Sequence, residues 1–78
     1  MPTVLRWGPY RFFIFGNDGS EPPHVHVQRD RALAKIWLRP IALASTTDFR
    51  AHELRRILRL VEDNQSRLEE AWHEFFGS

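Results

Sequence analysis

The 78-residue sequence contains no cysteine, which excludes disulfide bonds and thiolate metal sites together. It has no apolar run near the roughly 18–20 residues that a membrane-spanning helix needs. Its first ten residues lack the apolar segment of a secretory signal. We therefore expect a cytoplasmic protein without a membrane partner. The formal net charge of +1 is too small to argue for nucleic-acid binding by itself.

Lysine is scarce as well, because Lys35 stands alone against ten arginines. The sequence also lacks a phosphate-binding glycine loop, a serine nucleophile elbow and a His-Glu-x-x-His helix, so those enzyme classes are set aside. The length fits one domain over 1–78, β-rich over 1–45 and helical over 46–78. A chain this short has a thin core, so we expect a partner subunit or a homo-oligomer to support it.

Two β-prone runs lie at the start of the sequence. Thr3–Trp7 and Tyr10–Phe15 are separated by Gly8-Pro9, a turn signal, and are predicted to form a hairpin. Tyr10–Phe15 is apolar on both faces apart from Arg11, so we expect a central strand that is covered on both sides. A turn is predicted at residues 16–19.

A second hairpin is predicted from His24–Gln28 and Ala32–Leu38, with a two-residue turn at Asp30-Arg31. Strand alternation sets the valines on one face and the histidines on the other. The register that matches apolar with apolar residues pairs Val25 with Ile36, Val27 with Ala34, His26 with Lys35 and His24 with Trp37. Ile41–Ala44 is expected to add a short edge, which gives about four strands.

The back of the chain has helical periodicity. Apolar residues recur at intervals of seven, at Leu54, Val61, Leu68 and Phe75. Helix N-cap residues cluster at Ser45–Asp48, a break into two helices is favoured at Asn64–Ser66, and Ser66 with Glu69 has capping-box spacing. The predicted fold is α+β, with a small antiparallel sheet followed by one or two C-terminal helices packed on one face. The sheet's valine face should meet the helical stripe of Leu54, Ile57, Leu58, Val61 and Leu68.

The chemistry centres on His24 and His26, whose imidazoles project the same way from one strand. Such a pair can act as an acid and a base or chelate a metal, although a metal needs a third ligand from Glu21, His52 or His73. Three interpretations stay open: surface strand residues, a metal-free reactive or binding face, and a metal site.

Lys35 is expected beside His26, where its ammonium should disfavour the imidazolium and keep a general base neutral. A solvated cross-strand lysine is the alternative. Trp37, opposite His24, is more typical of packing than of ligand stacking.

A basic stripe follows helical spacing at His52, Arg55, Arg56 and Arg59. It could contact phosphates or an acidic protein, or simply face solvent. Trp72, Phe75 and Phe76 near the end are more typical of core than of a docking motif.

Five blocks carry a resemblance that spans nearly the whole chain. They read PTVLRWGPYRFFIF, EPPHVHV, AKIWL, ELRRILRLVEDN and EEAWHEFF. The sequence resembles the small bacterial domain-of-unknown-function 4160 family. The resemblance implies a stand-alone cytoplasmic bacterial protein. Members of the family are often encoded beside a domain-of-unknown-function 2442 protein, in pairs that have been proposed as type II toxin–antitoxin modules. The family carries no established reaction or catalytic residues.

Two functional hypotheses follow, and neither requires a cofactor. In the first, the chain is the toxin of such a module and acts on RNA, with His24 and His26 as acid and base and with Lys35 and Arg29 stabilising the developing phosphorane charge. In the second, it is a non-enzymatic, antitoxin-like module that binds a small cognate protein. The candidate substrate- or partner-binding residues are Glu21, Arg29, Trp37, Arg55, Arg56 and Arg59. A His-x-His metal-binding protein is the remaining alternative.

Overall fold

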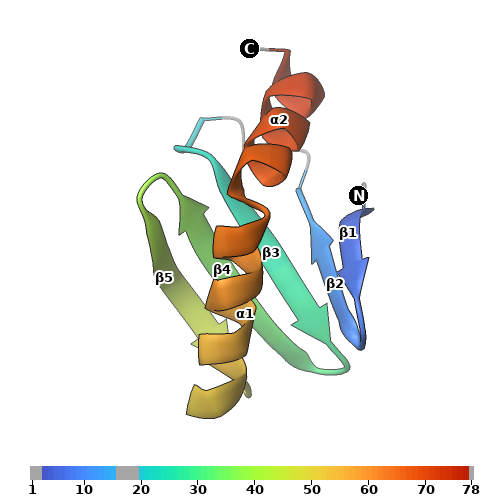
Figure 1. The fold of residues 1–78 in the computed structure, drawn as a ribbon, viewed down its shortest axis with the longest axis vertical. Coiled ribbons are helices and arrows are strands. Elements are labelled where there is room, and N and C mark those ends of the chain that lie inside the picture. The colour runs from blue at the N-terminus through green and yellow to red at the C-terminus, as the bar shows by residue number, and fades with distance from the viewer. Residues whose placement is uncertain (1–2, 16–19, 78) are drawn as a thin grey trace.

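The computed structural model describes residues 3–15 and 20–77. They form an antiparallel sheet of five strands in the order β1-β2-β3-β4-β5, followed by two helices (Figure 1). The strands are β1 (Thr3–Trp7), β2 (Tyr10–Phe13), β3 (His24–Arg29), β4 (Ala32–Leu38) and β5 (Ile41–Thr47), and the helices are α1 (Ala51–Asp63) and α2 (Gln65–Phe76). The predicted α+β fold is confirmed, with five strands where about four are predicted. The turn predicted at 16–19 lies outside the described residues.

Short turns connect neighbouring strands. Gly8-Pro9 joins β1 to β2, and Gly8 has a φ of 56°, which glycine adopts without a steric penalty. Asp30-Arg31 joins β3 to β4, as predicted, with Asp30 at a φ of 53°. Asp is among the few residues that tolerate this left-handed conformation. The two-residue turn fixes the β3–β4 register, because a slip by one residue would exchange the two faces of the strand.

The core lies between the valine face of the sheet and α1. Val25, Val27, Ile36, Ile57 and Val61 are each at most 1% exposed and belong to one apolar cluster. Leu68 of α2 joins the same cluster, and Leu54 and Leu58 pack against it. Figure 1 shows α1 crossing in front of β3 and β4, while α2 continues past the upper end of the sheet. The predicted packing of the helical stripe on the valine face is confirmed.

The helix starts differ from the sequence prediction. Ser45, Thr46 and Thr47 are in β5, so they do not cap α1; Arg50 stands at its N-cap and makes no side-chain cap bond. The capping prediction is wrong because β-branched threonines favour a strand where an open sheet edge accepts them. The break between two helices is confirmed, but it lies at Asn64, so Ser66 is inside α2 and forms no capping box.

Candidate functional site

The β3–β4 hairpin sets four candidate side chains on the sheet face opposite the valine core. The register pairs His24 with Trp37 and His26 with Lys35, as the sequence predicts. Because alternate residues of a strand share a face, these four side chains are neighbours. Their exposure, however, differs from the sequence expectation.

His24 is fully buried, so the prediction of an open face that presents both histidines is wrong. Its ring centroid lies 5.4 Å from that of Trp37 and 4.9 Å from that of Trp72 in α2. Its Nδ1 lies 2.9 Å from the carbonyl oxygen of Pro22. A carbonyl can only accept, so Nδ1 carries the hydrogen and donates it. An acid–base role for His24 would therefore fall to Nε2, which is buried, and would need movement of the surrounding side chains.

His26 is 9% exposed and lies among aromatic rings. Phe13 of β2 stacks beside the imidazole at a centroid distance of 5.5 Å, and Phe15 meets it edge-on at 4.4 Å. The ring of His24 is also edge-on to it, at 5.1 Å. The two histidines thus belong to one row of buried rings, and only His26 reaches the surface.

Lys35 is held by a carboxylate and an indole. Its ammonium donates to Oε1 of Glu21 at 2.5 Å and lies 4.7 Å from the ring centroid of Trp37. The side chains of Lys35 and Glu21 are 23% and 41% exposed. The charge that faces His26 is therefore that of an ion pair and not of a lone ammonium. The sequence placed Lys35 correctly but did not reveal this partner.

A shallow pocket of about 150 Å³ opens where His26 meets the surface. Its lining comprises Phe15, His26, Leu33, Ala34, Lys35, Ser45, Thr46 and Thr47. Ser45 and Thr47 were not among the predicted site residues. The edge strand that the sequence predicts ends at Ala44. Extending the predicted strand to Thr47 would have identified both residues, because Ser45 pairs with Lys35 and Thr47 with Leu33.

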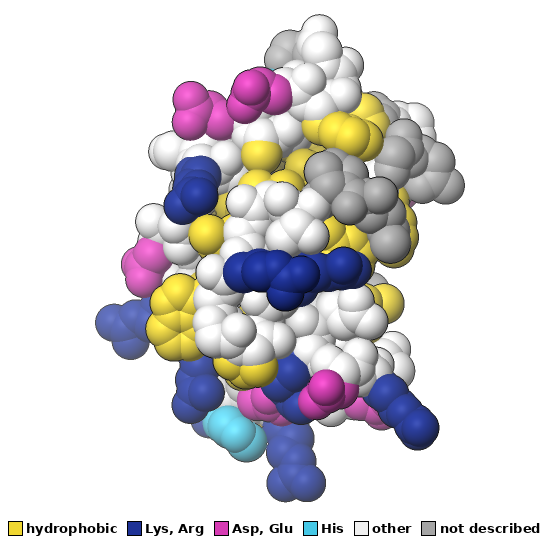
Figure 2. Space-filling view, turned by 90° about the vertical axis from the view of Figure 1, so that its right-hand side faces the viewer, with side chains coloured by type: hydrophobic (Ala, Val, Ile, Leu, Met, Phe, Trp, Pro, Cys, Tyr) yellow, Lys and Arg dark blue, Asp and Glu magenta, His cyan; other side chains and the backbone are white. Residues whose placement is uncertain are grey.

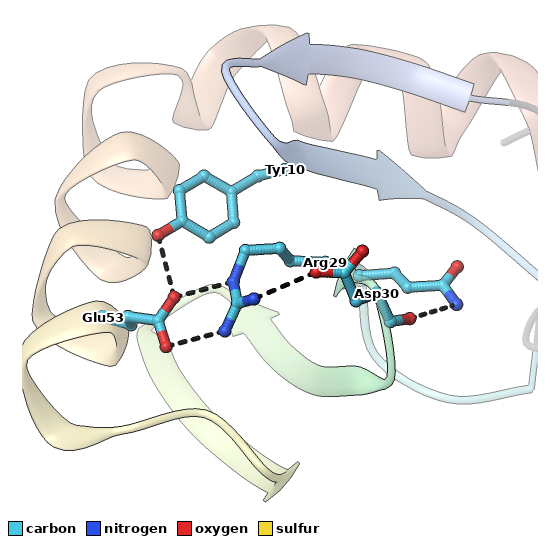
Figure 3. Close-up of polar contacts among 5 residues, drawn as sticks. Tyr10, Arg29, Asp30 and Glu53 are labelled. Atoms are coloured by element: carbon cyan, nitrogen blue, oxygen red, sulfur yellow. Dashed lines mark hydrogen bonds and ion pairs between the residues drawn. The ribbon is translucent and has the colours of Figure 1, made fainter.

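Arg29 lies on the other side of the sheet, among the groups drawn in Figure 3. Its Nε and Nη2 donate to the carboxylate of Glu53 at 2.8 and 3.0 Å, and the Tyr10 hydroxyl donates to the same carboxylate at 3.3 Å. The hydrogen bond from Arg29 lowers the pKa of Glu53, and the same bond raises the pKa of Arg29. Arg29 therefore joins β3 to α1 and does not stand beside His26.

The basic stripe lies on α1. Arg55, Arg56 and Arg59 are exposed, as is His52. At 100° per residue, Arg55 and Arg59 point nearly opposite to the buried Ile57. In Figure 2, Lys and Arg side chains are spread from the upper left to the bottom of the view, and Asp and Glu side chains lie at its top, at its left edge and low among the basic ones. The stripe and the His26 pocket lie on opposite faces of the sheet, so one small ligand cannot contact both.

Neither a metal cluster nor a membrane span was found where the structure describes the chain. Over residues 3–15 and 20–77 no group of three or more His, Cys, Asp or Glu side chains is arranged to hold a metal ion. Over the same residues no helix is both long and apolar enough to cross a membrane. The proposed third ligands His52 and His73 are exposed on separate helices.

Most of the chain matches a family model. The model described as domain of unknown function (DUF4160) matches residues 10–73. That range includes both histidines, the Lys35–Glu21 pair and nearly all of the two helices. No curated protein and no solved structure matches the chain.

Proposed function

We propose that this chain, which belongs to the domain of unknown function (DUF4160) family, is the partner-binding component of a bacterial two-protein module of the toxin–antitoxin type. The burial of His24 is the observation that carries the proposal. A general acid and base must both come within hydrogen-bond reach of the substrate. With His24 enclosed by Trp37 and Trp72, His26 is the one member of the pair that a ligand can reach.

The surface around the pocket suits a protein better than a small molecule. Pockets for small ligands start at about 300 Å³, and this one measures about 150 Å³. Its size matches one inserted side chain of a partner. Around it stand a half-buried tryptophan, an ion pair and an aliphatic side chain, a mixture that is typical of the centre of a protein interface. We call this the Lys35 surface, made of Glu21, Leu33, Lys35 and Trp37.

The proposed partner is the small protein encoded next to this one, as the family resemblance suggests. Leu33 is 37% exposed and offers apolar area that a partner can cover. Glu21 and Lys35 present one charge of each sign, so a partner with complementary charges can pair with both. The surface carries no net charge, so electrostatic attraction would contribute little to the binding of RNA, which is a polyanion.

A toxin that acts on RNA through His26 alone is the second candidate. The observation that favours it is the shared pocket of His26, Lys35 and the Ser45 hydroxyl, which combines a titratable group, a cation and a donor. This candidate would use one histidine as the base and would need its acid from elsewhere.

Growth after induced expression separates the two candidates. The binding component, expressed alone, should leave bacterial growth unchanged and should co-purify with the neighbouring protein when both are expressed. The RNA-acting candidate predicts arrest by the wild type and normal growth with a folded His26→Ala variant. Arrest that depends on His26 would therefore overturn the first proposal in favour of the second.

A further inference from the structure

β5 is an open edge of the sheet. The strand order places β4 on one side of β5 and no strand of the described chain on the other (Figure 1). Half of the backbone groups of an edge strand point away from the sheet and can pair with another strand. All residues from Ala42 to Thr47 are exposed, so these groups are accessible.

Two common protections of an edge strand are missing here. Ile41–Thr47 contains no charged residue and no proline, the two commonest devices against edge pairing. The other edge, β1, is shorter and carries the exposed Arg6. A bulge at Ala44 interrupts the β4–β5 ladder and confines a regular new ladder to one half of β5. The half from Ile41 to Leu43 is the more apolar of the two.

The apolar side chains of β5 lie on the helix side of the sheet. Leu43 pairs with Ile36 and Ile41 with Leu38, and both of these partners are core residues. Leu43 is nevertheless 38% exposed. α1, which contacts β5, adds the partly buried Leu54 and Leu58. Along this edge, aliphatic side chains of the core are therefore partly exposed to solvent and are not covered by polar residues.

We propose that β5 pairs with β5 of a second copy of this chain, antiparallel and about a two-fold axis. In such an interface only residues near the axis meet their own copies, and a residue farther away meets a different residue of the partner. β5 has no charged residue, so no register of this pairing brings like charges together, whereas β1 carries the exposed Arg6. Each copy would cover the other's Leu43 and Ile41. The pairing also supplies the buried area that a 78-residue chain lacks alone.

Sedimentation equilibrium over a range of micromolar concentrations tests the proposal with the untagged chain. The wild type should have twice the 9.3 kDa mass of one chain. Leu43→Lys should sediment as one chain, because it would place an ammonium group of each copy within the apolar contact. The matched control is Trp7→Lys, which places the same charge at the exposed end of β1 and should leave the dimer intact.

Ala42→Lys is the second variant, in case Leu43→Lys does not fold. It should also give single chains with an unchanged circular dichroism spectrum. A wild type that is a single chain at every concentration would overturn the proposal, even if it binds another protein through β5. A dimer that survives both β5 variants, or one that Trp7→Lys dissociates, would overturn it as well.

Discussion

The imidazole of His24 packs against the indole of Trp72, with 4.9 Å between the ring centroids. The contact joins the first residue of β3 to the middle of α2, and both side chains are at most 3% exposed. A histidine that belongs to the most distinctive motif of the sequence is thus part of the packed interior. The two histidines of the motif therefore have different positions, since His24 is fully buried and His26 is 9% exposed.

Truncation of His24 should destabilise the fold. His24→Ala removes a fully buried ring and leaves a cavity between two indoles, so the free energy of unfolding should fall by about 2–4 kcal/mol. Urea unfolding followed by circular dichroism measures this change. His52→Ala, on the exposed face of α1, is the control and should change stability by no more than about 0.5 kcal/mol. Equal effects of the two variants would contradict the packed role of His24.

His24 and Trp72 should be energetically coupled. A double-mutant cycle with His24→Ala and Trp72→Ala should give an interaction of about 0.5–1.5 kcal/mol, the range measured for buried ring pairs. The same cycle with Phe75→Ala, whose side chain is 43% exposed, should be additive within about 0.5 kcal/mol. Additivity in the Trp72 cycle would show that the contact contributes nothing of its own.

The Arg29–Glu53 pair should make stability depend on acidic pH. Because the pKa of Glu53 is lowered in the folded chain, its contribution is present above the ordinary glutamate pKa of about 4.3 and is lost as pH falls through the lowered value. The stability difference between wild type and Glu53→Gln should therefore be largest near neutral pH and should shrink below about pH 4.3. Thermal unfolding of both proteins between neutral and acidic pH checks this.

Glu62→Gln, also on α1 but exposed, is the matched control for this experiment. The difference in stability between this variant and the wild type should be the same at every pH. A Glu53→Gln variant whose stability difference is independent of pH would mean that the carboxylate of Glu53 gains nothing from Arg29.

Local pattern was enough to predict the hairpins and the core. The alternation in His24–Gln28, joined to a two-residue turn, determined the β3–β4 register, and the seven-residue spacing identified the helical stripe that covers the valines. Both are short-range or periodic signals. The same alternation also shows that Arg29 shares the face of Val25 and Val27, so its position away from His26 was available from the sequence and was overlooked.

The burial of His24 could not be predicted in the same way. It depends on Trp72, which lies 48 residues later and reaches β3 only because α2 continues past the end of the sheet. The pair of Lys35 with Glu21 depends likewise on how the chain approaches β3 after Pro22-Pro23. Periodicity assigns a residue to a face, but tertiary packing decides whether that face is open.

The affinity of three forms of this chain for the proposed partner protein, measured by calorimetry, tests the central claim most directly. Leu33→Glu alters the Lys35 surface at an exposed position, and Arg59→Glu places the same charge on the opposite side of the molecule. The account predicts that the wild type binds, that Leu33→Glu binds about tenfold more weakly or not at all, and that Arg59→Glu binds like the wild type. Unchanged binding by Leu33→Glu together with loss in Arg59→Glu would contradict it, because the partner would then dock on α1.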